Sequence, residues 1–237
     1  PKDVSTLPEG QERLERAIAY MGLASRREAK ELIKSGQVQV NGKTVRETGF
    51  GIVTEKDIVK VGNQVGVIKE ALMIYKPRGI ETTKTAPENN DIHDKFKGLE
   101  HLSPIGRLDK DSEGLIIMTN DGTLTRALTK ENSSVEKEYL VLVRESITPE
   151  GIKKLSNGIM LDKVLTKPAI VKKVSRSSFT IVLTEGRKHQ IRRMCDACHM
   201  TIESLTRIRI GHLKTGSMKP GFVKRISSAD IELLKKS

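Results

Sequence analysis

The spacing of its strand-like segments is the feature that most constrains the fold of this chain. Short apolar or alternating runs predict β-strands at Leu72–Lys76, Leu115–Thr119, Glu138–Val143 and Phe179–Thr184. Helical patterns are predicted after Asp121, over Thr148–Leu155 and around His189–Cys198. Strands and helices thus alternate, but without the regular spacing of repeated βαβ units. We predict an α+β fold with a mixed, largely antiparallel sheet and flanking helices.

The N-terminal part of the chain carries the signals of a separate small α/β unit. A helical apolar pattern begins near Leu14 and stops at Gly22. A second helix is predicted to start at Ser25, because Ser25 and Glu28 have the spacing of a capping box. Beyond this helix the pattern alternates as in a strand, and Asn41-Gly42 suits a type I′ hairpin turn. Two helices followed by a hairpin are therefore expected.

The boundary between this unit and the larger one is placed before the strand at Leu72. The first dozen residues are polar, contain two prolines and predict a poorly ordered tail. We assign the tail and the small unit to residues 1–62, a Gly-containing connection to 63–71 and a larger domain to 72–237. Two domains fit the length of 237 residues, since domains commonly hold about 100–200 residues.

The charge of the chain points to a polyanionic partner. Its 42 Lys and Arg exceed its 30 Asp and Glu, which gives a formal net charge of +12. Residues 187–236 contain twelve basic and four acidic side chains, so that most of the excess lies in the last fifth of the sequence. Nucleic acid is the first candidate for such a partner. We expect a localised basic surface near the C-terminal end.

The cysteine count and the absence of a membrane signal narrow the cellular compartment and the partners that we expect for this chain. Two cysteines, Cys195 and Cys198, are too few for a disulfide scaffold and fit a reducing compartment, which we expect to be the cytosol. No apolar run approaches the length of a membrane span, so a membrane partner is not expected. Aromatic residues are only 3% of the chain, which argues against a single-strand binder built on rows of stacked rings.

The most informative segment is Gly106–Leu115, with the sequence GRLDKDSEGL. It is a dense polar run directly before the apolar residues of a predicted buried strand, and polar loops at strand ends are favourable places for catalytic groups. By residue type alone, however, Asp109 and Asp111 are more often turn-forming carboxylates that bond their own backbone. The segment needs further support before it can be assigned a chemical role.

That support comes from a resemblance. Gly106–Leu115 resembles a signature of the pseudouridine synthases of the RsuA, RluB, RluE and RluF family, and the resemblance implies that Asp109 is the catalytic nucleophile. Lys137–Val141 resembles the segment whose tyrosine stacks on the target uracil and can act as a base, which implies these roles for Tyr139. Glu185–Cys195 resembles a third signature and implies that Arg192 pairs with the catalytic carboxylate. Lys76-Pro77 and Gly79 match the entry strand and turn of the family.

A second resemblance covers roughly Gln11–Val61, which is similar to the small RNA-binding module named after the fourth protein of the small ribosomal subunit. Taken alone, the basic stripe on its second helix is more often a solvated helix face. The resemblance favours RNA contacts instead. We expect RNA to contact Arg26, Arg27, Lys30 and Lys34 on this helix, and Arg107, Arg187, Lys188 and Arg193 in the larger domain.

The implied reaction requires no cofactor, because it detaches uracil from its sugar, rotates the base and rejoins it through carbon. Neither a redox partner nor an external group is consumed. The carboxylate can add to the ring or assist departure of the base, and the sequence leaves both routes open. In either route Asp109 has to be ionised, and we expect Arg192 to supply the opposite charge that favours this state. A base in a stacked helix also has to be flipped out.

Two rival functions have to be weighed, a non-catalytic RNA-binding factor and a zinc enzyme, and the RNA substrate has to be identified. A non-catalytic RNA-binding factor would not need all three of Asp109, Tyr139 and Arg192, and a zinc enzyme would need more ligands than Cys195 and Cys198 with nearby histidines. No metal or nucleotide site is expected. Gly158–Lys173 is most similar to the RluF type, which implies a large-subunit rRNA stem-loop as substrate, with a tRNA as the alternative, and we expect a monomer.

Overall fold

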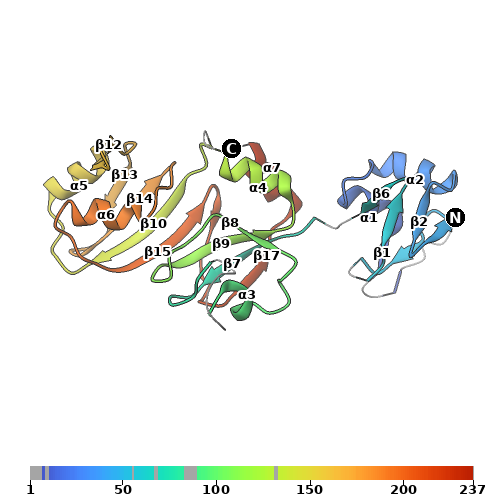
Figure 1. Cartoon of the computed structure of the whole chain (residues 1–237), viewed down its shortest axis with the longest axis horizontal. Coiled ribbons are helices and arrows are strands. Elements are labelled where there is room, and N and C mark those ends of the chain that lie inside the picture. The colour runs from blue at the N-terminus through green and yellow to red at the C-terminus, as the bar shows by residue number, and fades with distance from the viewer. Residues whose placement is uncertain are drawn as a thin grey trace. The chain divides into compact units, whose positions relative to one another are not determined.

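The computed structural model describes residues 7–8, 11–54, 56–66, 69–82, 90–130 and 133–236 (Figure 1). The chain divides into two compact units, Pro1–Lys69 and Glu70–Ser237. Most of the expected N-terminal tail lies outside the described residues. None of the helices within these ranges is both long and apolar enough to cross a membrane.

The N-terminal unit packs two helices against short strands. Its helices are α1 (Leu14–Tyr20) and α2 (Arg26–Lys34). An antiparallel sheet has the order β3 (Lys43–Val45), β2 (Val38–Val40), β5 (Val59–Val61) and β6 (Gln64–Gly66), and β1 (Glu12–Arg13) pairs separately with β4 (Gly51–Ile52). The apolar faces of both helices and the sheet share one core, which includes Leu14, Ile18, Ile33, Val38 and Val59.

Local signals in the sequence explain where these elements start and turn. The hydroxyl of Ser25 accepts the backbone N–H of Glu28 at 3.3 Å, and the carboxylate of Glu28 accepts the backbone N–H of Ser25 at 2.8 Å. This confirms the predicted capping box at the start of α2. Asn41 and Gly42 have φ angles of 50° and 79°, and a type I′ turn requires positive φ at both positions.

The structure differs from the sequence prediction at the expected connection 63–71. Gln64–Gly66 forms strand β6, which pairs with β5 and belongs to the N-terminal unit, and Ala71 already begins the next strand. Two of the three β6 residues are exposed. Such a short edge strand buries too little apolar surface to give a periodic pattern, so its residues resemble a loop in the sequence.

The C-terminal unit is built on one mixed sheet. Its strands follow the order β13 (Ile170–Lys173), β14 (Ser178–Leu183), β10 (Lys137–Val143), β15 (Ile202–Ile210), β9 (Glu113–Thr119), β7 (Ala71–Lys76) and β17 (Val223–Arg225), with β16 (Leu213–Lys214) on β15 and β8 (Ser103–Ile105) on β9. Only the pairing of β9 with β15 is parallel among the described strands. The predicted mixed, largely antiparallel sheet is confirmed, and β11 (Met160–Leu161) pairs apart with β12 (Val164–Leu165).

Helices cover both faces of the sheet in the C-terminal unit (Figure 1). They are α3 (Ile92–Lys95), α4 (Gly122–Thr129), α5 (Pro149–Asn157), α6 (Gln190–Asp196) and α7 (Ser228–Lys236). Figure 1 shows α5 and α6 over the β10–β14 half, and α4 with α7 over the β9 half. The side chains of Asp121 and Thr148 cap α4 and α5, at the positions where the sequence predicts these helices to begin.

Strand β9 is buried on both faces. Leu115 and Ile117 pack with residues of α4 and α7, whereas Ile116 and Met118 pack with Ile92 of α3 on the opposite face. Alternate side chains of a strand point to opposite faces of the sheet. A strand covered on both faces therefore needs a continuous apolar run, which is why this strand is easily recognised in the sequence.

The central strand β15 is absent from the sequence predictions. It lies between β10 and β9 and is the longest strand described, at nine residues. Its sequence, IESLTRIRI, contains Glu203, Arg207 and Arg209, and these charges obscure the apolar alternation. Arg207 is buried all the same, with 2% of its surface exposed. The central position of β15, between β10 and β9, thus places the charged side chain of Arg207 inside the C-terminal unit.

Gly114 is required where β9 and β15 run side by side. Its φ of +110° is a conformation that residues with a Cβ rarely adopt, and a Cβ here would overlap the backbone carbonyl of Arg207. The register pairs Gly114 with Arg207 directly. The absence of a side chain at Gly114 therefore permits the single parallel pairing, among the described strands, that joins the two antiparallel parts of the sheet.

Substitution of Gly114 by Ala should lower the free energy of unfolding by roughly 3 kcal/mol or more, because it combines backbone strain with overlap of two main chains. Gly122→Ala is the matched control, since a Cβ at this helical position meets nothing within 4 Å. That control should stay within about 1 kcal/mol of wild type. Urea titration of both variants measures the difference, and equal stabilities would contradict the steric role of Gly114.

Candidate active site

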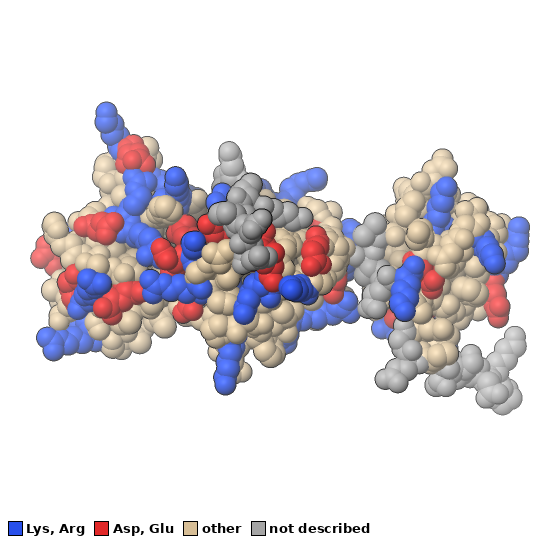
Figure 2. Space-filling view, turned by 60° about the horizontal axis from the view of Figure 1, so that its bottom comes forward, with Lys and Arg blue, Asp and Glu red and all other residues tan. Residues whose placement is uncertain are grey.

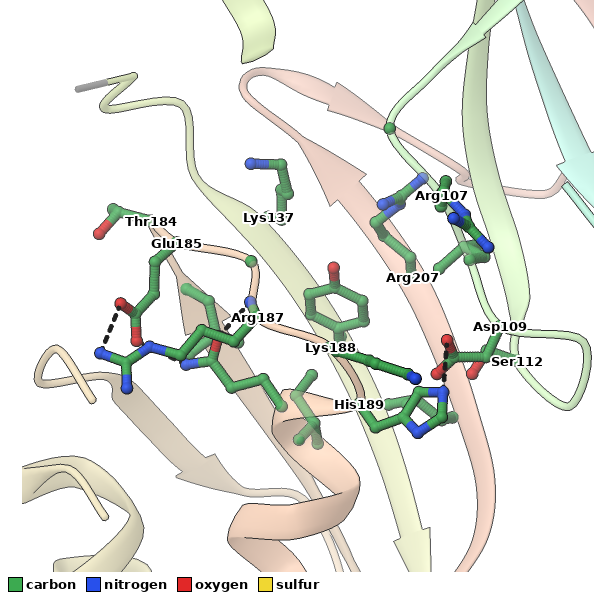
Figure 3. A pocket seen from close by; sticks show the side chains of 18 of the residues that line it. Arg107, Asp109, Ser112, Lys137, Thr184, Glu185, Arg187, Lys188, His189 and Arg207 are labelled. Carbon is green, nitrogen blue, oxygen red and sulfur yellow. Dashed lines mark hydrogen bonds and ion pairs between the residues drawn. The ribbon is translucent and has the colours of Figure 1, made fainter. Parts of the chain in front are cut away.

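A basic pocket lies on the C-terminal unit beside strands β10 and β15 (Figure 3). Its volume is about 840 Å³, near the upper end of the range of roughly 300–1,000 Å³ for small-ligand pockets. Among the described residues, two carboxylates line it, those of Asp109 and Glu185. Seven described Lys or Arg side chains line it as well, namely Arg107, Lys130, Lys137, Arg187, Lys188, Arg192 and Arg207. The excess of positive charge suits a negatively charged ligand.

Asp109 lies in the loop that connects β8 to β9, and several hydrogen bonds fix this loop. The hydroxyl of Thr82 donates to the carbonyl of Leu108 at 2.7 Å and accepts its N–H at 3.2 Å. The N–H of Ser112 donates to the carbonyl of Asp109 at 3.0 Å, and the N–H of Gly79 donates to the carbonyl of Lys110 at 2.8 Å. The main chain on both sides of Asp109 is therefore held in place, while its side chain, 37% exposed, lines the pocket.

A fully buried ammonium group lies beneath this loop. Lys76, at the end of β7, donates from Nζ to the carbonyls of Ile80 at 2.6 Å and Pro77 at 2.9 Å. A longer contact of 3.5 Å reaches the carbonyl of Lys110 in the Asp109 loop. Burial lowers the pKa of Lys76 to about 8, while the carboxylates of Glu113, Asp109 and Asp111 act in the opposite direction. Hydrogen bonds from the ammonium group of Lys76 thus link the turn after β7 to the Asp109 loop.

Arg192 of α6 and His189, at the N-terminal end of this helix, approach the carboxylate of Asp109. Nε2 of His189 lies 3.4 Å from Oδ1, and Nε of Arg192 lies 3.8 Å from Oδ2. Arg192 also donates from Nη2 to the carbonyl of Asp111 and to Oγ of Ser112, both at 3.1 Å. The structure therefore brings Arg192 to Asp109 and links α6 to the loop. The carboxylate is partly exposed, so that water also stabilises its charge.

Tyr139 lines the same pocket from strand β10. Its ring is partly buried and packs against the cores on both sides of the sheet centre. Its register partner on β15 is Arg207, so that both side chains stand on one face of the sheet. Its hydroxyl has no hydrogen-bond partner in the described parts of the chain. The three residues singled out for catalysis, Asp109, Tyr139 and Arg192, are thus all at one pocket.

The expected RNA contacts of the C-terminal unit divide into two groups. Arg107 and Lys188 are exposed and line the pocket. Arg187 lines it too, but its guanidinium is occupied by the carbonyls of Val164 and Leu165 at 3.1 and 2.8 Å. Arg193 does not line the pocket, because it faces Asp162 with an ion pair of 2.6 Å.

On α2 of the N-terminal unit, Arg26, Arg27, Lys30 and Lys34 are all exposed. Lys34 pairs with Glu31 at 3.3 Å. The other three side chains have no hydrogen bond or ion pair within the described ranges. They are therefore available to phosphates.

The expected basic surface of the last fifth of the chain is dispersed. Arg209 pairs with Glu136 at 2.9 Å and Glu138 at 2.7 Å, and Arg225 pairs with Glu70 at 2.9 Å. On the face in Figure 2, Lys and Arg are interspersed with Asp and Glu. Ion pairs between residues distant in sequence neutralise much of this segment. Positive charge gathers instead in the pocket, where the sequence had assigned no role to Lys137 or Arg207.

A carboxylate on a fixed loop, a phenol and several cations thus meet in one pocket, a combination that suits an enzyme acting on a polyanion such as nucleic acid. Residues 70–197 match the family described as RNA pseudouridylate synthase, and residues 12–59 match the S4 domain. The chain therefore belongs to the RNA pseudouridylate synthase family, whose members are isomerases acting on RNA. This confirms both resemblances inferred from the sequence.

Similar proteins agree over nearly the whole chain. The dual-specificity RNA pseudouridine synthase RluF of Escherichia coli (strain K12) is 38% identical over 91% of this chain and 75% of its own length. The ribosomal large subunit pseudouridine synthase B of Bacillus subtilis (strain 168) is 34% identical over 94% and 96%. A crystal structure of a pseudouridylate synthase superposes with a TM-score of 0.66 at 28% identity, over 94% of this chain and 99% of that chain.

The buried ammonium of Lys76 should be detectable in the pH dependence of stability. Its pKa of about 8 in the folded chain lies below the ordinary value of 10.5. Between these values the unfolded chain binds more protons, so that the contribution of Lys76 to stability rises with pH. The free energy of unfolding of wild type relative to Lys76→Met should therefore increase by about 2 kcal/mol between about pH 7 and about pH 10. Exposed Lys172→Met is the control and should run parallel to wild type; a parallel course for Lys76→Met would contradict the lowered pKa.

Proposed function

We propose that this protein converts a uridine in structured RNA to pseudouridine, with Asp109 as the nucleophile. The observation that supports this most strongly is the position of Asp109. Its carboxylate lies in the pocket 3.8 Å from Arg192, on a loop that is fixed from both sides. Asp111, two residues further on, is exposed and contributes its backbone carbonyl to Arg192 rather than its carboxylate. The geometry favours Asp109 over Asp111 as the reacting group.

The reaction is an isomerisation, in which the bond between N1 of uracil and C1′ of the ribose breaks and a bond between C5 and C1′ forms. The proton on C5 is lost and N1 gains one, so that no redox partner is needed. Asp109 either adds to the nucleotide or assists departure of the base. Arg192 and His189 stand beside the charge of Asp109 in both routes. Tyr139 supplies a ring face that holds the base while it turns.

The target uridine has to leave the RNA stack before Asp109 can reach it. A pocket of about 840 Å³ has room for a flipped nucleotide, and its cations can hold the displaced backbone. The described residues that line the pocket all belong to the C-terminal unit. They include Asp109, Tyr139 and Arg192 of one chain, which supports our proposal that the protein works as a monomer.

For the RNA itself we propose a stem-loop of large-subunit rRNA, with a tRNA as the second candidate. The name of the Bacillus subtilis relative gives the large ribosomal subunit as its substrate, and the Escherichia coli relative is described as dual-specific. The S4 domain, with the exposed cations of α2, would hold a part of the RNA away from the reacting uridine. Two separate binding surfaces, the pocket and the cations of α2, would then together select the RNA substrate.

The role of Asp109 is tested by a pair of substitutions in neighbouring carboxylates. Asp109→Asn should abolish pseudouridine formation in an rRNA stem-loop while leaving RNA affinity within a few-fold, because shape is kept and the nucleophile is removed. Asp111→Asn is the control and should retain most of the single-turnover rate. Persistent turnover by purified Asp109→Asn would exclude it as nucleophile, and a wild-type protein that binds RNA without turnover would favour the non-catalytic alternative.

The role of α2 is tested by the salt dependence of binding. A triple variant, Arg26→Gln, Arg27→Gln and Lys30→Gln, should bind the stem-loop more weakly, with a salt slope shallower by roughly 0.7–0.9 for each phosphate that α2 no longer neutralises. The single-turnover rate at saturating RNA should change less than the affinity, because the pocket is intact. Removing three exposed charges at Lys153, Lys154 and Lys172 is the control. Equal slopes in both variants would show that α2 does not contact this RNA.

A further inference from the structure

Arg207 is a buried cation without a charged partner among the described residues. Its side chain comes from the central strand β15, and 2% of the residue is exposed. Nε donates to the carbonyl of Leu115 at 2.7 Å, which fixes the guanidinium, whereas Nη2 is buried and has no hydrogen-bond partner. Within the described parts of the chain no carboxylate forms an ion pair with it. An unpaired charge in this position is costly, so the arrangement suggests a partner from outside the chain.

Lys137 is a second cation that lines the same pocket and the hollow beside it. It stands on β10 two residues before Tyr139, so both side chains lie on one face of the sheet, about 7 Å apart along the strand. Burial, with a further effect of Arg207, lowers the pKa of Lys137. The ammonium has neither a hydrogen bond nor an ion pair with any described residue. Figure 3 shows Lys137, Arg207 and Arg107 along one side of the pocket, and Asp109 with His189 on another.

The walls around these two cations offer no negative charge among the residues that the structure describes. A hollow of about 30 Å³ adjoins the pocket, and its described lining is apolar apart from Lys137, Arg207 and Thr129. The two carboxylates of the main pocket have partners elsewhere. Asp109 faces His189 and Arg192, and Glu185 accepts a hydrogen bond of 2.6 Å from Gln190. Among the described residues of the pocket, none therefore supplies the charge that balances Lys137 and Arg207.

We propose that Lys137 and Arg207 form a binding subsite for one phosphodiester of the RNA, adjacent to the nucleotide held at Tyr139. This inference rests on the proposed function, because Tyr139 is taken as the residue that holds the base. Uracil is neutral, and phosphodiesters are the anions of RNA. A guanidinium with a free Nη2 and a nearby ammonium make charge-assisted hydrogen bonds to such oxygens. The register of Tyr139 with Arg207 fixes how far this phosphate lies from the base.

The subsite is tested by neutralising one phosphate at a time. A set of stem-loop RNAs, each with a single methylphosphonate near the target uridine, is bound to the full chain as wild type, Lys137→Gln, Arg207→Lys and the exposed control Lys172→Gln. One linkage should cost wild type and the control roughly tenfold in affinity or more. Lys137→Gln should bind the unmodified RNA about tenfold more weakly than wild type does. Its affinity should fall little further when the methylphosphonate is placed at that linkage. Arg207→Lys keeps the positive charge but loses the two parallel N–H donors of the guanidinium. Its affinity penalty at that linkage should lie between those of wild type and Lys137→Gln.

Lys137→Gln keeps the test decisive if Arg207→Lys does not fold, because Lys137 is only partly buried and makes no structural hydrogen bond with a described residue. A penalty profile for Lys137→Gln that matches wild type at every linkage would overturn the subsite. Binding is measured separately from pseudouridine formation on the unmodified RNA. Wild type that binds without turnover would reject the proposed function while the affinity profile still decides the phosphate subsite.

Discussion

The parallel pairing of β9 with β15 is the interaction on which the C-terminal unit depends. It joins two antiparallel groups of strands, and it forms at Gly114, where the main chains approach too closely for a side chain. The Asp109 loop leads into β9 immediately before this pairing. Arg207 is the residue of β15 that is paired with Gly114. Tyr139 is the next residue across the sheet. The Asp109 loop, the phenol of Tyr139 and the buried guanidinium of Arg207 are thus positioned by one strand pairing.

Buried cations organise the site at a cost in stability. Lys76 holds the turn after β7 against the Asp109 loop through backbone carbonyls rather than through a carboxylate. The carboxylate of Asp109 in this loop faces the pocket instead. Arg207 is retained with only one of its hydrogen bonds observed. An apolar residue at either position would avoid the desolvation of a charge, which is consistent with retention for function rather than for stability.

Much of this arrangement is predictable from local pattern, and the remainder is not. Strand β9, the capping box at Ser25 and the turn at Asn41 follow from short segments whose own residues fix the conformation. Asp109, Tyr139 and Arg192 were identified through motif resemblance, and their shared pocket agrees with it. Strand β15 was missed because its charged residues break the pattern of a buried strand. The charge distribution was missed for a different reason: Arg225 pairs with Glu70, which is 155 positions away.

The two outer strands of the sheet bear on how copies of this protein meet one another. Strand β13 carries Lys172 and Lys173 next to each other, and strand β17 carries Lys224 and Arg225. An uncovered strand edge is a template on which another chain can add a strand, and in concentrated solution such addition leads to aggregation. Lys172 and Lys173 on one edge and Lys224 on the other would meet like charges if a second copy aligned with that edge, whereas Arg225 is paired with Glu70. Basic residues at both margins of the sheet therefore disfavour the addition of a strand from another copy, independently of any role in binding RNA.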